Sequence, residues 1–278
     1  MILLIIIFVC LVTAIMVFWH IPYSKTKAEF QRLASGLHKS ASAAPDKVFT
    51  KEDWAPLPLP VRKYFETAGF TGMPQMSSMK AVFRKVDFIL SPSKPAITID
   101  YTQYNFIEQP ARIAFINTSM YGVPFQGLDS YGGGEGGMKA VLGKTFTLFN
   151  QRGGELDQAS LVTFLSEVML LPSAALQSYI TWKKIDDLHA EAIISRYGIT
   201  ASGIFSFREN GECSSFSTED RTAIGMDGSK QKVKWTAYMD TYRMIRGVRQ
   251  PTHLKAVWHY EQGDLVYFDS DNLQLEYR

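Results

Sequence analysis

Glu167 is the residue of this chain best suited to chemistry, because its carboxylate stands inside an apolar stretch with helical periodicity. Phe164 and Leu171 are its neighbours on the expected helix face. Burial disfavours a charged carboxylate, so such a group either pairs with a cation or keeps a proton and acts as an acid. We favour a salt bridge, with Arg221 as the candidate partner, and acid catalysis by Glu167 is the alternative.

Polar side chains in strand-like stretches are further candidates for ligand contacts. They are Gln103, Tyr104 and Tyr131. A mostly apolar pocket commonly orients its ligand through a few polar groups of this kind. Ordinary strand packing with solvated polar tips is the alternative for all of them.

A glycine-rich run, residues 132–137, contains the pattern G-x-G-x-x-G. In dinucleotide-binding proteins this pattern follows a strand and opens a helix, whose N-terminus meets the pyrophosphate. Only Met138–Leu142 separates the run from Gly143, which leaves no room for a helix. The run therefore predicts a turn, a bulge or a close approach of two backbones, with a functional loop at a pocket rim as the alternative.

Metal and nucleophile motifs are missing from the sequence. His253 and His259 share a strand face, but six residues span roughly 20 Å, too far for one metal ion. Asp269–Asn272 lacks the glycine and terminal glutamate of a calcium loop, so it predicts a hairpin turn. We therefore expect no metal, no cofactor and no catalytic residue, and an enzymatic role is not favoured.

The charge balance argues against a nucleic-acid partner. The chain has 278 residues with 29 Lys and Arg against 27 Asp and Glu, a formal net charge of +2. Proteins that bind nucleic acid through phosphates usually carry a clear basic excess.

The N-terminus predicts a membrane anchor over residues 1–22. Met1–Trp19 carries no charge, and about 19 helical residues approach the ~30 Å of hydrocarbon in a bilayer. A cleaved signal peptide is the alternative, but the basic region that would precede its apolar stretch is missing. The basic residues after the anchor favour a cytoplasmic body by the positive-inside rule, with an extracytoplasmic body as the alternative; they are Lys25, Lys27, Arg32 and Lys39.

The remaining chain predicts a linker and one β-rich domain. Residues 23–50 predict a juxtamembrane helix and a flexible connection, and residues 51–278 a single domain. Short helices are expected from Leu59 to a stop at Gly69, over 157–171 with Asp157 as its cap, and over 173–179. About ten strands with short connections predict a mainly β, α+β fold, in which a large antiparallel sheet curls into a half-barrel with helices on its concave side. The expected strands cover 80–90, 96–107, 112–121, 181–185, 191–197, 203–208, 213–221, 232–242, 252–260 and 265–277.

Sequence pieces in a fixed order resemble a known family. The pieces are LPLPVRKYFETAG, DYTQY, LDSYGGGEGGMKAVLG, ELDQASLVTFLSEVMLLPSAALQSYITW, and DTYR with GVRQPT. Together they resemble an uncharacterised bacterial family, the domain of unknown function six-five-four-four, over roughly residues 57–277. This resemblance implies membrane association and supplies no activity or catalytic residues. The strand–helix–strand layout is also similar to the half-barrels of lipoprotein carriers, at the level of fold alone.

These observations lead to one favoured function and two alternatives. We expect a non-catalytic module that binds a lipid or another apolar ligand and is attached to the bilayer through residues 1–22. The expected ligand-binding residues are Gln103, Tyr104, Tyr131, Glu167, Trp182 and Arg221. The alternatives are a hydrolase of unknown substrate that uses Glu167 and an envelope scaffold that acts through its surface.

Overall fold

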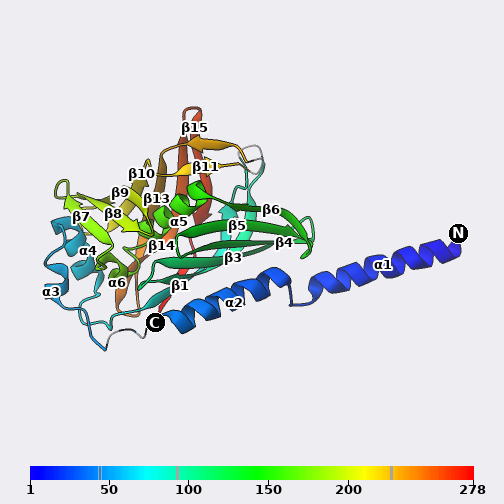
Figure 1. Ribbon diagram of the computed structural model, residues 1–278, viewed down its shortest axis with the longest axis horizontal. Coiled ribbons are helices and arrows are strands. Elements are labelled where there is room, and N and C mark those ends of the chain that lie inside the picture. The colour runs from blue at the N-terminus through cyan, green and yellow to red at the C-terminus, as the bar shows by residue number, and fades with distance from the viewer. Residues whose placement is uncertain (43, 45, 92–93, 226–227) are drawn as a thin grey trace.

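The structure is a computed structural model that describes residues 1–42, 44, 46–91, 94–225 and 228–278 (Figure 1). Residues 43 and 45 of the expected linker lie outside this description. The helices are α1 (Ile2–His20), α2 (Lys25–Ser40), α3 (Lys51–Trp54), α4 (Leu59–Ala68), α5 (Gly154–Ser166) and α6 (Pro172–Ala175). The strands are β1 (Ser78–Phe88), β2 (Ile97–Phe106), β3 (Ala111–Met120), β4 (Val123–Gly132), β5 (Glu135–Leu142), β6 (Phe146–Arg152), β7 (Ile180–Lys184), β8 (His189–Arg196), β9 (Ile199–Phe207), β10 (Cys213–Thr218), β11 (Thr222–Ile224), β12 (Lys230–Lys232), β13 (Trp235–Ile245), β14 (Val248–Tyr260), β15 (Gly263–Ser270) and β16 (Leu273–Tyr277).

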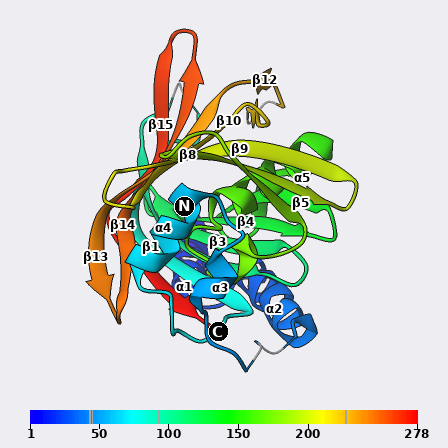
Figure 2. The same cartoon turned by 90° about the vertical axis from the view of Figure 1, so that its left-hand side faces the viewer.

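One large antiparallel sheet dominates the described part of the chain. Its strand order is β6-β5-β4-β3-β2-β1-β15-β14-β13-β10-β9-β8-β7, with β16 paired to β1, and β11 and β12 form a separate hairpin. Figure 2 shows the sheet curling around α5. The predicted mainly β fold with a large curled antiparallel sheet is therefore confirmed.

Residues 123–152 form strands β4, β5 and β6, none of which is among the strands expected from the sequence. Gly133 and Gly134, with φ of 63° and 90°, make the turn between β4 and β5. Gly136 lies so close to α5 that an added Cβ would stand 2.4 Å from the Leu156 carbonyl oxygen. The glycine run thus serves a turn and a close backbone approach, as predicted, and no helix follows it.

Helix α5 begins and ends earlier than the apolar pattern predicts. It starts after Gly153, whose φ is 127°, and Asp157 accepts a hydrogen bond from the Gly136 N–H at 2.6 Å instead of capping the helix. Glu167 follows the last helical residue, so the expectation that it lies within the helix was wrong. Its placement at a helix C-terminus, where the backbone dipole disfavours negative charge, bears on its protonation.

Aromatic residues build the core at the end of the sheet where α3 and α4 lie. The Trp54 ring stacks between Phe49 and Phe65, with centroid distances of 4.8 and 4.7 Å. Gly69, with φ of 87°, ends α4 as predicted, and its α-carbon faces the Gly247 carbonyl. Phe49 is 1% exposed, so the chain just before α3 already packs with the body.

Helix α2 packs on the convex side of the sheet. Phe30 contacts the rings of Tyr104 and Phe115, and Glu29 forms an ion pair with Lys139. The expected juxtamembrane helix is therefore part of the folded body's surface and not a free spacer.

Helix α1 has no buried residue, and its end is held by the turn between β5 and β6. Lys144 in that turn is 7% exposed and donates to the carbonyl oxygens of Phe18 and Ile21. Its ammonium also lies 5.6 Å from the centroid of the Phe18 ring. The helix is long and apolar enough to cross a membrane, a property that membrane spans share with signal sequences.

Candidate ligand-binding cavity

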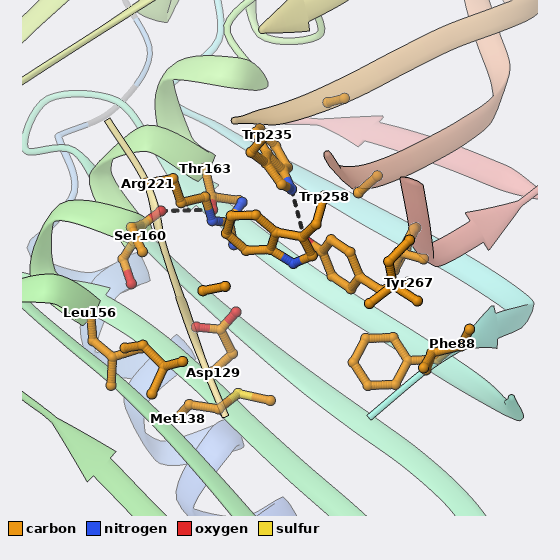
Figure 3. Close-up of a pocket in the computed structure, with 18 of the residues that line it drawn as sticks. Phe88, Asp129, Met138, Leu156, Ser160, Thr163, Arg221, Trp235, Trp258 and Tyr267 are labelled. Atoms are coloured by element: carbon orange, nitrogen blue, oxygen red, sulfur yellow. Dashed lines mark hydrogen bonds between the residues drawn. The ribbon is translucent and has the colours of Figure 1, made fainter. Parts of the chain in front are cut away.

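A cavity of about 670 Å³ lies between the concave face of the sheet and helix α5. Strands β1 to β6 and β13 to β15 supply one wall, α5 supplies another, and the β11–β12 hairpin borders it. Its aromatic lining includes Phe83, Phe88, Tyr101, Trp235, Trp258 and Tyr267, several of which Figure 3 labels. The volume falls within the range of small-molecule sites, which are commonly lined by apolar and aromatic groups.

A hydrogen-bonded set of polar side chains, which we name the Glu167 network, lies against this cavity. It comprises Tyr101, Gln103, Asn105, Arg112, Asp129 and Glu167. Glu167 Oε2 accepts hydrogen bonds from Gln103 Nε2 at 2.7 Å and from Asn105 Nδ2 at 2.6 Å.

Arg112 is the cation of the Glu167 network. Its Nη1 donates to Asp129 Oδ2 at 2.7 Å, and its Nη2 donates to Tyr101 Oη at 2.6 Å and to Gln103 Oε1 at 2.8 Å. Strand register explains the assembly, because Asn105 on β2 pairs with Arg112 on β3, and Ala114 on β3 pairs with Asp129 on β4. Neighbouring strands thus place these side chains on one face of the sheet.

Burial shifts the protonation equilibria within the Glu167 network. Burial raises the pKa of Glu167 above its ordinary value, although the Arg112 charge and the hydrogen bonds from Asn105 and Gln103 lower it. Burial lowers the pKa of Arg112, but Asp129, Tyr101 and Glu167 more than reverse this effect, so the guanidinium stays charged. Burial therefore favours the protonated form of Glu167 more than in a solvent-exposed glutamate.

A second group of side chains, which we name the Arg221 stack, also borders the cavity. The guanidinium carbon of Arg221 lies 4.3 Å from the Trp235 ring centroid and 5.3 Å from that of Trp258. Trp235 and Trp258 are direct cross-strand partners on β13 and β14. Figure 3 shows Arg221 between these rings and Thr163 of α5.

The predicted pairing of Glu167 with Arg221 was wrong. Arg112 supplies the positive charge near Glu167, while Arg221 stacks on tryptophan rings. Sequence reasoning missed Arg112 because a single arginine within an apolar strand is usually a solvated edge residue. It missed Trp235 and Trp258 because their pairing depends on strand register.

The predicted ligand-contact residues separate into two groups. Gln103, Glu167 and Arg221 line the cavity, and Tyr104, Tyr131 and Trp182 do not. Strand alternation sends Tyr104 to the opposite face from Gln103, where its ring lies 5.9 Å from that of Phe30 on α2.

Tyr131 and Trp182 belong to the packed interior. Tyr131 is 2% exposed, and burial raises the pKa of its hydroxyl. Trp182 donates from Nε1 to the Ala175 carbonyl at 2.9 Å and packs on Phe205. The contacts of Trp182 account for its position, whereas Tyr131 is buried in the core with a hydroxyl that has no hydrogen-bond partner among the described residues.

Among the described residues, no group of three or more His, Cys, Asp or Glu side chains is placed so that it could hold a metal ion. What the cavity offers is an apolar interior with one hydrogen-bonded network and one stacked cation. Fold and site together define a class of protein: a curled antiparallel sheet that, with a helix on its concave side, encloses an apolar cavity.

The chain belongs to the family of unknown function DUF6544, whose model matches residues 47–270. Among solved structures it is similar to a LolA superfamily protein from Nitrosomonas europaea, with 12% identity and a TM-score of 0.43 over 78% of this chain and 93% of that one. It is also similar to a domain from Vibrio parahaemolyticus described as a candidate outer membrane lipoprotein-sorting protein, with 10% identity and a TM-score of 0.37 over 72% of this chain and 84% of that one. No curated protein matches the sequence.

Proposed function

We propose that this protein binds a lipid or another apolar ligand in the cavity between the sheet and α5, without catalysing a reaction. The cavity itself carries the proposal: about 670 Å³ of space lined largely by aromatic and aliphatic side chains. An apolar surface of this extent is costly to leave in water, and an apolar ligand would remove that cost. An envelope scaffold would need only its outer surface and would not require such a space.

Lipid retention by the full chain tests this function. We expect native mass spectrometry of the protein, extracted from membranes in mild detergent, to show a tightly retained lipid. Ala237 lines the cavity on β13, so Ala237→Trp should fill part of the space and reduce the retained lipid several-fold. Ala55→Trp adds the same side chain at an exposed position beyond α3 and serves as the control. Equal retention by all three proteins would contradict binding in the cavity.

We further propose that residues 1–22 anchor the protein in a bilayer and that the body, residues 51–278, lies on the cytoplasmic side. Support comes from the uncharged helix α1 and from the basic residues that follow it: Lys25, Lys27, Arg32 and Lys39. Membrane-impermeant maleimide on intact cells tests the side, with single cysteines introduced into the body of a Cys10→Ser, Cys213→Ser protein. Labelling only after lysis is expected, and efficient labelling of intact cells would reverse the assignment.

A hydrolase that uses Glu167 is the second candidate, favoured by one observation. Glu167 borders the cavity, and burial raises its pKa, so the side chain can hold a proton for general acid catalysis. Incubation of the protein with acyl esters, followed by mass spectrometry of the products, separates the candidates. Turnover that Glu167→Gln abolishes would establish the hydrolase, and intact esters bound without turnover are expected of the binding module.

A further inference from the structure

We propose that Arg221 binds the anionic head group, a carboxylate or a phosphate, of an amphiphile whose apolar part occupies the cavity. This inference rests on the proposed function, because it names the chemical class of the ligand for the same cavity.

The first argument is the unused hydrogen-bonding capacity of Arg221. Its Nε and Nη1 are buried, yet neither has a hydrogen-bond partner among the described residues. A guanidinium cannot shed its charge near neutral pH, so buried donors without acceptors are costly to maintain. An anionic group of a ligand would supply the missing acceptors.

The second argument is how the guanidinium is held. Trp235 and Trp258 contact it through ring faces, and its Nε and Nη1 at the edge have no acceptor among the described residues. Trp235 is itself fixed, because its Nε1 donates to Tyr267 Oη at 3.1 Å. Stacking thus orients Arg221 in advance while leaving its donors available, an arrangement suited to charge-assisted hydrogen bonds.

The third argument is the charge of the other groups that border the cavity. Arg112 is bound to Asp129, Lys230 is bound to Glu155 at 2.8 Å, and Lys255 lies over the Tyr238 ring. In the Glu167 network the charge of Arg112 is already paired with that of Asp129, which leaves no uncompensated positive charge for an anion there. The head group is therefore directed to Arg221, and the apolar part to the aromatic lining.

Photo-crosslinking of the full chain in proteoliposomes tests this inference. The probes are a photoactivatable fatty acid, the fatty alcohol of the same chain, and a phosphatidic acid carrying the same photoreactive group. Crosslinked probe on peptides from residues 221–258 measures binding in the cavity. Crosslinked probe on α1 measures contact with the bilayer and is used to normalise the three probes. We expect either anionic probe to label the cavity peptides about tenfold more than the alcohol, as one charge-assisted hydrogen bond allows.

Variants assign this preference to Arg221. Arg221→Met should lower anionic labelling to the alcohol level and leave alcohol labelling unchanged, which also shows that the cavity is intact. Arg221→Lys should keep part of the preference, and Arg243→Met, at an exposed position of β13, should keep all of it. A preference that persists in Arg221→Met overturns the proposal, and so does an equal response of the wild type to all probes.

Further outcomes separate this inference from the proposed function. Cavity labelling by the alcohol and the anionic probes alike removes only the role of Arg221. No cavity labelling by any probe removes both. Loss of the preference on adding inorganic phosphate would show that Arg221 takes a free anion, which also overturns the proposal.

Discussion

Arg112 and Arg221 lie on the same concave side of the sheet, but they are held in opposite ways. Arg112 donates from both Nη atoms to a carboxylate, a phenol and an amide of the Glu167 network, and its buried Nε alone of the three nitrogens lacks an acceptor among the described residues. Arg221 is held by two tryptophan faces, with two buried nitrogens left without acceptors in the described chain. The difference indicates that Arg112 joins strands β2, β3 and β4, whereas Arg221 is prepared for a group that arrives from outside.

The sharpest test of this comparison is Arg112→Met. Its loss leaves the partly buried Asp129 and Glu167 without their cation, and breaking a fully buried pair commonly costs about 3–5 kcal/mol in free energy of unfolding, so we expect a loss toward the lower end of that range. Chemical denaturation of the full chain in detergent would measure this loss. A cost below about 1 kcal/mol would show that Arg112 is not structural and would remove the contrast with Arg221.

A double-mutant cycle sharpens the role of the Arg112–Asp129 pair. Arg112→Met combined with Asp129→Asn removes both charges, so the double variant should be more stable than the sum of the two single losses predicts. We expect a coupling of about 2 kcal/mol, because the two side chains are in direct contact and Arg112 is buried. Strict additivity in the denaturation curves would assign the cost of Arg112→Met to packing rather than to this pair.

Glu167→Gln tests the protonation of the network. It should change the free energy of unfolding less than Arg112→Met does. Because burial raises the folded-state pKa of Glu167 above its ordinary value, the folded protein binds more protons than the unfolded chain at pH values between the two. The stability associated with Glu167 is therefore complete below the unfolded pKa and is lost as pH rises through the folded one. Denaturation across pH should show this loss in the wild type and a flatter profile in Glu167→Gln, and parallel profiles would contradict it.

The smallest change in stability is expected for Arg221→Met. Two effects oppose each other, because the variant loses stacking on Trp235 and Trp258 but also removes buried donors that lack acceptors. The free energy of unfolding should therefore change by less than about 1 kcal/mol in the ligand-free protein, measured as for Arg112→Met. A loss as large as that of Arg112→Met would give both arginines the same structural role.

The general fold could be predicted because the amino-acid composition of most strands is typical of β-structure. Val, Ile, Phe, Tyr and Thr alternate with turn residues over most of the body, and the connections are too short for crossover helices. Strands β4 and β5 were missed because Gly127, Gly132, Gly136 and Gly137 weaken the β signal, although these glycines sit within the paired strands. In this part of the sheet, pairing with neighbours outweighs local preference.

The site could be predicted only in part. Gln103 and Glu167 were predicted as ligand contacts because they are polar residues in apolar stretches, and both border the cavity. Their partner Arg112 comes from a strand whose register to β2 no local pattern reveals. Tyr104 shows the same limit from the other side, since a shift of one residue decides which face of a strand a side chain occupies.

The contact between Lys144 and the end of α1 has a mechanical consequence. Because this lysine donates to carbonyl oxygens at the end of α1, the β5–β6 turn and the helix end move together as a rigid unit. If α1 spans a bilayer, these hydrogen bonds prevent the body from rotating freely about residues 21–24. The opening of the cavity would then keep a fixed orientation relative to the bilayer surface. Loss of the Lys144 hydrogen bonds would leave the body attached to α1 only through a flexible connection.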